Sequence, residues 1–390
     1  MVLTEPPRVS ITIVAMFERQ RAERAPQKRG RRPAADARYA QLLICNPINY
    51  KLCEQIIQLA LACAGAFDNP CFWSIVAIRG WKMLRVDQVA NRWQLHCAAH
   101  TVKALLPFKR QLRAVKRRIA SSPHVVAESS VYPGGFHHIS ALRDAGFTLE
   151  GKHVLELGTG WFPVIPLMLR LGGASRVYLT DVEHLLDQNT ILVAADFLLS
   201  KKEDLAQKLN IDIAGIEQLL LAPRNLSFDG LLQWFQLAYI CPFDAGKDLL
   251  SVDCIVSHTV LEHIPEHVLR KIFRDTRSLL RPGGLHSHGI DHTDHRANVD
   301  PRLSRVDFLR YNDWTWRLFC INAQDYTNRL RHSDYVSMLR ETRYKIVFER
   351  KFVNERCAME AKHMKLWGRF RDMDVEDLAT AWSHVVAKPC

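Results

Sequence analysis

The stretch Val154-Leu-Glu-Leu-Gly-Thr-Gly-Trp-Phe-Pro163 decides the fold of this 390-residue chain. Apolar residues around Glu156 predict a short buried strand, and Gly158 and Gly160 predict a sharp turn into the apolar run 164–169. A strand, a glycine turn and a helix bring backbone N–H groups close to a ligand. The dinucleotide pattern G-x-G-x-x-G would need a third glycine where Pro163 stands. A carboxylate two residues before the first glycine suits a cationic ligand better than a pyrophosphate.

A second acid follows at the end of another apolar segment, Arg176-Val-Tyr-Leu-Thr-Asp181, 23 residues after Gly158. A carboxylate at the tip of the second strand can accept hydrogen bonds from both ribose hydroxyls of a nucleoside. The alternative is an aspartate that caps the next helix.

Two later segments extend the pattern: Asp253-Cys-Ile-Val-Ser-His-Thr-Val-Leu-Glu-His-Ile264, and the Pro-Gly-Gly turn within 280–285. Together with Glu-x-Gly-x-Gly at 156–160, they resemble motifs I, IV and V of the class I S-adenosylmethionine (SAM) methyltransferases. The resemblance implies an α/β fold with a doubly wound, mostly parallel, seven-stranded sheet, and SAM as the cofactor. It covers 105–390 and is strongest to a bacterial subgroup, through segments 158–163, 260–264, 288–295 and 328–335. Phe162 stands where many relatives have a third glycine.

The expected cofactor site follows from these motifs. Just after the third expected strand, Asp244 and the backbone of Ala245 are candidates to contact the adenine amino group, as the resemblance implies. Asp244 is equally well placed to form a turn before Gly246. The full set of expected cofactor-binding residues is Glu156, Gly158, Thr159, Gly160, Asp181, Val182, Asp244, Ala245 and Ser257.

Candidates for the chemistry come after strands four and five. The segment 286–295 holds four histidines and two aspartates, and histidine is suited to proton transfer near neutral pH. We expect His288, Asp291 and His295, with His258 after strand four, to act as a base or to orient the acceptor. Two alternatives are a metal site and a purely structural hydrogen-bonded cluster. Some quinone-pathway O-methyltransferases hold a metal with a Glu-Val-Leu-Glu-His segment; Thr259 replaces the first glutamate here, and no metal ligand is assigned.

Residues 296–335 are rich in aromatic residues and arginine, and we expect this insertion to cover the active site. Arg329 and Arg331 can grip a carboxylate or phosphate, and Tyr311, Trp314 and Trp316 can stack on a planar or sugar face. Alternatively, the aromatic residues form the core of the insertion, and the arginines pair with Asp325 and Asp334.

The expected organisation is a basic flexible tail at 1–40, a helical region at 41–124 and a methyltransferase domain at 125–390 with a helical insertion at 185–235. Seven strands are expected at about 152–158, 176–181, 236–241, 252–257, 284–290, 344–353 and 380–387. The last two strands have no long helix between them.

The net charge of +12 is carried by the first 124 residues, which hold 21 Lys and Arg against 7 Asp and Glu. The basic stretch therefore lies outside the predicted cofactor core. This placement argues against a nucleic-acid substrate, as does the absence of an Asn/Asp-Pro-Pro-Tyr/Phe motif at Ser257-His-Thr-Val. An amphipathic helix at 107–119 can dock on the core, an anionic membrane surface or a phosphate-bearing partner.

Ten scattered cysteines without a C-x-x-C pair indicate a reducing, cytoplasmic setting. The sequence contains no uncharged apolar stretch of 18 residues, so it predicts no transmembrane helix. The expected function is transfer of a methyl group from SAM to an oxygen or nitrogen of a small molecule, with sugars and glycan precursors as candidate acceptors. The alternatives are a nucleic-acid methyltransferase and a SAM-binding protein without catalysis. The sequence does not set the oligomeric state.

Overall fold

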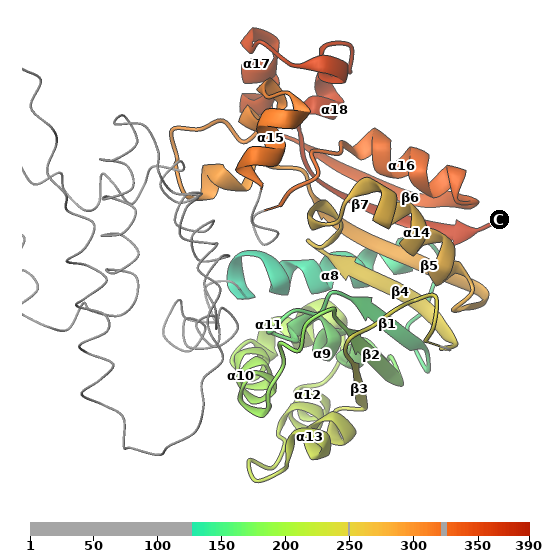
Figure 1. Cartoon of the computed structure of the whole chain (residues 1–390). Helices are drawn as coiled ribbons and strands as arrows, with labels where there is room; N and C mark the ends of the chain where they lie inside the picture. The colour runs from blue at the N-terminus through green and yellow to red at the C-terminus, as the bar shows by residue number, and fades with distance from the viewer. Residues whose placement is uncertain (1–126, 249, 321–325) are drawn as a thin grey trace, which may run out of the picture. The chain divides into compact units, whose positions relative to one another are not determined.

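The computed structural model describes residues 127–390 except 249 and 321–325 (Figure 1). The predicted tail at 1–40, the helical region at 41–124 and the amphipathic helix at 107–119 lie outside the described residues.

A seven-stranded sheet forms the centre of the described part, in the order β3-β2-β1-β4-β5-β7-β6. All neighbouring pairs are parallel except those that involve β7, which runs antiparallel to β5 and β6. The predicted mostly parallel, seven-stranded sheet is confirmed. The strands are β1 (His153–Leu157), β2 (Arg176–Thr180), β3 (Leu237–Ile240), β4 (Val252–His258), β5 (Leu280–Asp291), β6 (Tyr344–Val353) and β7 (Thr380–Pro389).

Strands at the centre of the sheet are buried on both faces, as parallel strands require. In β1, Val154 packs with one hydrophobic cluster and Leu155 with another, because successive side chains point to opposite faces. One boundary differs from expectation: β5 begins at Leu280, so the Pro-Gly-Gly segment lies within the strand. A register shift between β4 and β5 at Val252 and Cys254 accommodates this segment, and Gly283 has a φ of 83° there.

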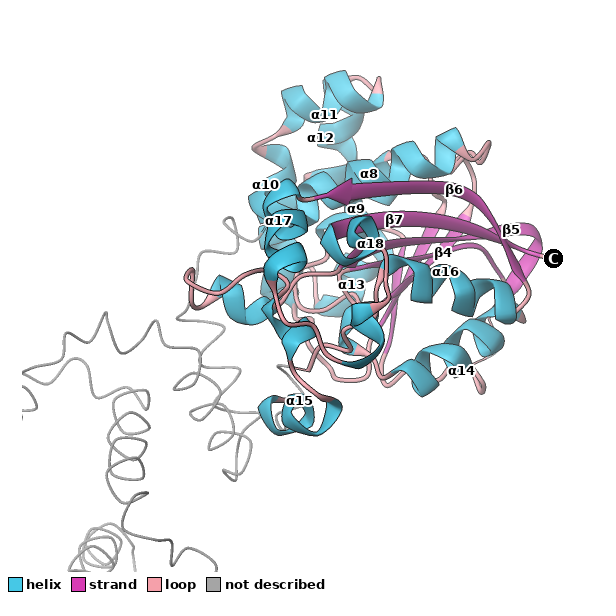
Figure 2. Cartoon of the chain, turned by 90° about the horizontal axis from the view of Figure 1, so that it is seen from above, coloured by secondary structure: helices cyan, strands magenta, loops and turns pink. Residues whose placement is uncertain are grey.

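Helices cover both faces of the sheet (Figure 2). Helices α8 (Tyr132–Asp144) and α9 (Val164–Leu171) contribute to the cluster on one face, around Val154 and Val256. Helices α14 (Glu266–Arg277) and α16 (His332–Glu341) contribute to the cluster on the other, around Ile290 and Val385. The fold is therefore doubly wound, with a core on each side of the sheet.

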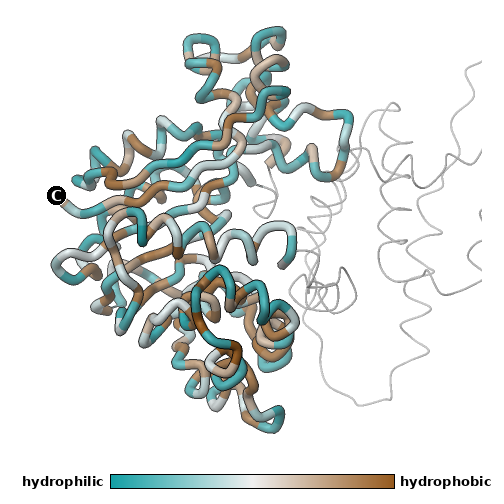
Figure 3. Tube along the Cα trace, turned by 180° about the vertical axis from the view of Figure 1, so that it is seen from behind, coloured by the Kyte–Doolittle hydropathy of each residue, from teal (hydrophilic) through white to brown (hydrophobic). Residues whose placement is uncertain are grey.

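Segment 185–235 holds four helices: α10 (Gln188–Leu199), α11 (Lys202–Leu209), α12 (Ile213–Leu220) and α13 (Phe228–Trp234). Three of them begin at a side-chain cap, from Asp187, Asp212 and Ser227. Hydrophobic residues recur between hydrophilic ones along these helices (Figure 3), so each presents an apolar stripe to the core.

A third hydrophobic cluster lies beyond the last strands and is centred on Phe308, Trp316 and Phe370. It joins η7 (Asp307–Arg310) and α15 (Asp313–Phe319) to α17 (Glu355–His363), η8 (Gly368–Arg371) and α18 (Val375–Ala379). The short helix η6 (His295–Asn298) precedes it in the chain. The connection from β6 to β7 thus holds three short helical segments, α17, η8 and α18, and no long helix, as expected. The remaining elements are η4 (Ala127–Val131) and η5 (Leu261–His263). Among the described residues, no helix is long and apolar enough to cross a membrane.

Candidate functional site

The turn between β1 and α9 depends on glycine for two reasons. Gly158 has a φ of 72° and Gly160 a φ of 71°, in the left-handed region that glycine adopts without strain. A Cβ on Gly158 would also lie 2.7 Å from Val260, which follows β4. The loop is fixed to the second strand by amides of Gly158 and Thr159, which donate to the Thr180 carbonyl at 2.9 and 3.0 Å.

Asp181 lies at the tip of β2 and binds this same loop. Its Oδ2 accepts a 3.0 Å hydrogen bond from the amide of Gly160, and its Oδ1 accepts from the amide of Val182 at 2.7 Å. The Asp181 carbonyl accepts a further bond from the amide of Phe243, at 3.0 Å, which places the β3 exit beside it. The ends of β1, β2 and β3 therefore meet around one carboxylate.

Glu156 is the buried acid of the site. Its side chain is 5% exposed, and Oε2 has no hydrogen-bond partner among the described residues. Burial raises the pKa of Glu156 to about 7, the nearby Thr159 hydroxyl opposes that rise, and the charge of Asp181 adds to it. Two carboxylates thus lie close together, and among the described residues no cationic side chain is paired with the buried one.

The predicted adenine residues lie beside this pair, at the β3 exit. Val182 is 79% exposed, so its apolar side chain faces solvent directly next to Asp181. Asp244 is half exposed; its Oδ1 accepts from the Gly246 amide at 3.1 Å, and its Oδ2 pairs with Lys247. The hydrogen bond to Lys247 is the main cause of a lowered pKa for Asp244. The structure contains the turn before Gly246 that the sequence offered as the alternative, and Ala245 lies within it.

Ser257 and His288 contact each other inside the sheet rather than at its edge. Ser257 Oγ lies 2.8 Å from His288 Nδ1, and His288 Nε2 lies 3.0 Å from His286 Nδ1. Both residues are fully buried, and burial lowers the pKa of His288 to about 3. Tyr344 and Phe273 close the group on the side of α14. His288 is therefore separated from solvent and belongs to a buried hydrogen-bonded group.

His258 packs between α8 and β5. A Cβ on Gly134 would lie 2.4 Å from the ring and one on Gly289 would lie 2.8 Å from it, so both glycines make room for this imidazole. Its Nδ1 has no partner among the described residues, and burial lowers the pKa of His258 to about 4. At neutral pH the ring is uncharged.

The carboxyl ends of β4 and β5 bring together four polar side chains. His295 Nε2 lies 3.3 Å from Asp291 Oδ2, and the ring centroids of His263 and His295 are 5.0 Å apart. Glu262, His263 and His295 each offer a donor atom within 4.8 Å of the others. Burial raises the pKa of Glu262 well above its ordinary value, and the charge of Asp291 acts in the same direction. For Asp291, burial is the largest single influence and acts to raise the pKa, but the hydrogen bonds from His295 and Thr293 and the charge of His295 together lower it.

Of the predicted catalytic residues, the structure thus brings Asp291 and His295 into contact and buries His288 within the sheet. His258 pairs with Gly289 in the sheet and lies within range of the Asp291 charge. Glu262 and His263 are the residues without an assigned role that lie in this group. Their segment is visible in the sequence as Val-Leu-Glu-His-Ile. Their proximity to His295 cannot be read from the sequence, because His295 follows β5, more than 30 residues after the segment that follows β4.

The two arginines predicted to grip an anionic acceptor are used inside the protein. Arg331 is fully buried and donates to four backbone carbonyls, including those of His292 at 2.7 Å and Thr380 at 2.6 Å. Arg329 donates to the carbonyl of Phe308 and pairs with Asp313. Burial lowers the pKa of Arg331 to about 10. These contacts fit the alternative, in which the arginines support the insertion. Asp334 accepts from the backbone amide of Arg331 rather than from its guanidinium, and Asp325 lies outside the described residues.

Most of the aromatic residues that were predicted to stack on the acceptor also pack or bond inside the insertion. Trp316 is 5% exposed within the third hydrophobic cluster, and the guanidinium carbon of Arg296 lies 5.0 Å from its ring centroid. Tyr311 donates a 3.1 Å hydrogen bond to Asp307. Only Trp314 of the three predicted stacking residues is strongly exposed, at 70%.

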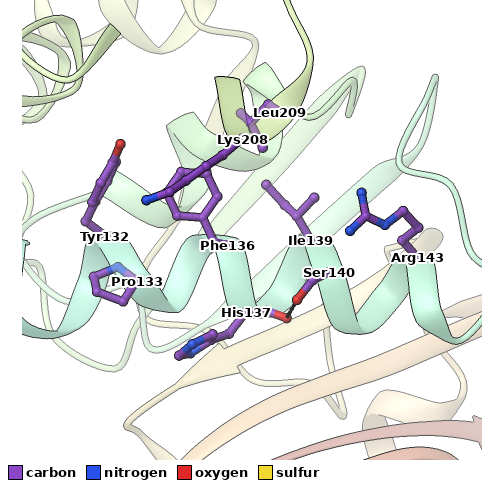
Figure 4. Close-up of a pocket in the computed structure, with 9 residues that line it drawn as sticks. All are labelled: Tyr132, Pro133, Phe136, His137, Ile139, Ser140, Arg143, Lys208 and Leu209. Atoms are coloured by element: carbon purple, nitrogen blue, oxygen red, sulfur yellow. Dashed lines mark hydrogen bonds between the residues drawn. The ribbon is translucent and has the colours of Figure 1, made fainter. Parts of the chain in front are cut away.

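A separate hollow of about 370 Å³ lies between α8 and α11 (Figure 4). Phe136 and Lys208 face each other there, with Lys208 Nζ 4.8 Å from the ring centroid. None of the predicted site residues lines it, so we do not place the active site there.

No protein-family model matches the chain, and no curated protein matches its sequence. Solved structures similar to it include an S-adenosylmethionine dependent methyltransferase from Mesorhizobium loti, at 14% identity over 64% of this chain and 95% of that chain, with a TM-score of 0.35. Geranyl diphosphate methyltransferase in complex with SAM is 12% identical over 66% and 85%, with a TM-score of 0.37. Magnesium protoporphyrin IX methyltransferase from Synechocystis PCC 6803, with bound SAH, is 13% identical over 66% and 83%, with a TM-score of 0.32. At such identities and TM-scores, none of these similarities assigns an activity to this chain.

Proposed function

We propose that this chain is a SAM-dependent methyltransferase that methylates an oxygen or nitrogen of a small molecule. The observation that carries the proposal is the pair of acids at the ends of β1 and β2. Glu156 is buried with an unpartnered carboxylate oxygen, and Asp181 binds the glycine loop beside it. A nucleoside that carries a positive charge satisfies both groups, whereas a pyrophosphate would be repelled by them.

The cofactor would lie across the ends of β1, β2 and β3, where ligands of doubly wound sheets bind. Asp181 would accept hydrogen bonds from the ribose hydroxyls, with Val182 against the adenine and Asp244 with the backbone of Ala245 near its amino group. Glu156 would attract the sulfonium and amino-acid part of SAM across the loop 158–160. Ser257 would take part through its backbone, because its side chain is bonded to His288.

The acceptor side would be formed by Asp291 and His295, at the ends of the neighbouring strands. These two residues form an ion pair or hydrogen bond at 3.3 Å. Such a pair can orient a hydroxyl or amine toward the methyl carbon or accept its proton. His288 has no such role in this proposal, because it is fully buried within β5. Sugars and glycan precursors are the first acceptors to test.

Calorimetry on the full chain with SAM and S-adenosylhomocysteine tests the cofactor. We expect one site per chain, with affinity lost in Glu156→Gln and Asp181→Asn and retained in Asp229→Asn. Asp229 is an exposed carboxylate on α13 and serves as the matched control. No heat of binding by the wild-type chain would refute the proposal.

A methyl-release assay on candidate acceptors then tests catalysis. We expect His295→Ala to lose turnover and to keep its affinity for SAM. Binding of SAM without turnover on any acceptor class would favour the second candidate, a SAM-binding protein without catalysis. Turnover on RNA or DNA would favour a nucleic-acid methyltransferase.

A further inference from the structure

We infer that Glu262, His263 and His295 form a binding site for one divalent transition-metal ion at the carboxyl ends of β4 and β5. Their donor atoms lie within 4.8 Å of one another. Ligand atoms around a bound zinc ion lie about 3–4 Å apart, since each metal–ligand bond is about 2.0–2.2 Å long. Small side-chain rotations would close the set around an ion.

Glu262 provides an independent observation. The residue is 4% exposed, and neither carboxylate oxygen has a hydrogen bond of ordinary geometry to the described residues. The backbone amides of Glu262 and Asp291 lie near enough to favour the charged form, but burial outweighs them. A charged carboxylate in such a place is unfavourable unless it is bound to a cation or becomes neutral. The carboxylate of Asp291 is close enough to oppose its charge. A divalent ion would balance both acids.

The hydrogen bonds of the two histidines prepare them to bind a metal. His263 Nδ1 lies 2.8 Å from the carbonyl oxygen of Tyr326. A carbonyl only accepts, so Nδ1 carries the hydrogen and the basic lone pair is on Nε2. His295 contacts the Asp291 carboxylate through Nε2, which leaves Nδ1 as its basic atom when Asp291 accepts from Nε2. A histidine that donates its other N–H to a carboxylate or a carbonyl is the usual arrangement around a protein-bound metal.

The backbone around Glu262 is held in place from two sides. Thr259 has a φ of 51°, a left-handed conformation that is strained for a β-branched residue. This turn directs the chain from β4 into η5, and the Thr259 amide donates to Gly289 of β5 at 2.9 Å. Asn328 then donates to the carbonyls of Leu261 and Ile264 at 2.8 Å each. The strained turn is thus maintained by contacts from both β5 and the insertion.

Two imidazoles and one carboxylate favour a borderline transition metal, such as Zn²⁺, Mn²⁺ or Fe²⁺, over Mg²⁺ or Ca²⁺, which prefer oxygen ligands alone. Three protein ligands leave coordination positions open for the acceptor. If the proposed function holds, the acceptor is a hydroxyl-bearing molecule whose oxygen binds the ion. It would release its proton to Asp291 or solvent, and its oxygen would bond to the methyl carbon as the carbon–sulfur bond breaks, with the electron pair staying on sulfur.

Metal binding is measured on the full chain, after treatment with a chelator and in the absence of SAM. Zn²⁺, Mn²⁺ and Mg²⁺ are titrated separately by calorimetry, and bound metal is counted by elemental analysis. We expect one Zn²⁺ or Mn²⁺ per chain that competes against excess Mg²⁺. Affinity should fall at least about tenfold in Glu262→Gln, His263→Gln and His295→Ala. His267→Ala is the control, because His267 is exposed in the first turn of α14, four residues after His263 in the sequence.

The visible spectrum of the Co²⁺-loaded wild-type chain provides a second readout that does not depend on variants. We expect the spectrum to differ from that of aqueous Co²⁺ and to revert when Zn²⁺ is added. The inference is overturned if the wild type binds none of these ions, or if Glu262→Gln and His295→Ala bind as the wild type does. Failure to bind SAM would refute the proposed function but not the metal site, because the two are measured separately.

Discussion

The backbone amide of Gly160 donates a 3.0 Å hydrogen bond to Oδ2 of Asp181, so the tip of the second strand holds the glycine loop of the first. Asp181 also accepts from the amides of Val182 and Glu183 through its other oxygen. One carboxylate therefore shapes the loop and, in the proposed cofactor site, would also accept hydrogen bonds from the ribose. The two roles can be separated by experiment, because loop shape affects stability and ribose contact affects affinity.

Asp181→Asn keeps one oxygen as an acceptor but removes the charge. Because hydrogen bonds to a charged acceptor contribute about 1.5–3 kcal/mol each, we expect the Kd for SAM to rise by about 10- to 100-fold. The free energy of unfolding should change by less than that of Asp181→Ala, which removes the acceptor for Gly160. Calorimetry and chemical denaturation provide the two measurements. Equal affinity in wild type and Asp181→Asn would remove Asp181 from the cofactor site.

The affinity for SAM should depend on pH through Glu156. Its pKa is raised to about 7, and a positively charged ligand prefers the ionised form. Above pH 7 the carboxylate is already charged, so affinity should be highest there. Below pH 7 binding must release a proton, and the Kd should rise by up to about tenfold per pH unit. Calorimetry from pH 6 to pH 8.5 checks this dependence.

Glu156→Gln is the control for that series, because it has the same shape and no titration. Its weaker affinity should change less with pH than that of the wild type. The same substitution should stabilise the ligand-free fold at pH 8, since the raised pKa means that ionised Glu156 opposes folding above its unfolded pKa. A pH dependence that is identical in both proteins would assign the titration to another group.

Gly158 and Gly151 form a matched pair for the glycine loop. Both have φ near 70°, but a Cβ on Gly158 would lie 2.7 Å from Val260, whereas one on Gly151 would meet nothing within 4 Å. We expect Gly151→Ala to cost about 1–2 kcal/mol of unfolding free energy, and Gly158→Ala to cost more. Adding Val260→Ala should recover part of the difference. Denaturant titration measures all four proteins, and equal costs for the two glycines would contradict the close approach.

The sheet could be predicted from the sequence because its strands are short apolar runs separated by clear turns. Val154 and Leu155 are buried on opposite faces, as the continuous apolar pattern around Glu156 indicated. The glycine loop was equally visible, because its conformation is local. The partners of Arg331 were not, since they are backbone carbonyls on β7 and α18 that no residue type marks. Likewise, the roles of His288 and His295 depend on which one lies within a strand and which beyond its end. Seven residues of sequence separation do not reveal that difference.

Arg331 was predicted to bind a carboxylate or phosphate of the acceptor, but its contacts lie inside the protein. It is fully buried, and its guanidinium donates to the carbonyls of His292, Asp377, Leu378 and Thr380. Arg331→Met would leave these acceptors without a donor, and each buried unsatisfied group costs about 1–3 kcal/mol. We expect a loss of at least about 3 kcal/mol in unfolding free energy.

Arg224→Met is the comparison for this substitution, because Arg224 is 60% exposed and pairs with Asp196, which is 43% exposed. An exposed ion pair contributes about 0–1 kcal/mol, so this variant should melt close to the wild type. A residue that gripped the acceptor would instead raise the KM and leave stability unchanged. Thermal melts together with KM measurements on both variants distinguish these outcomes. A normal melt with a raised KM in Arg331→Met would restore the anion-binding role.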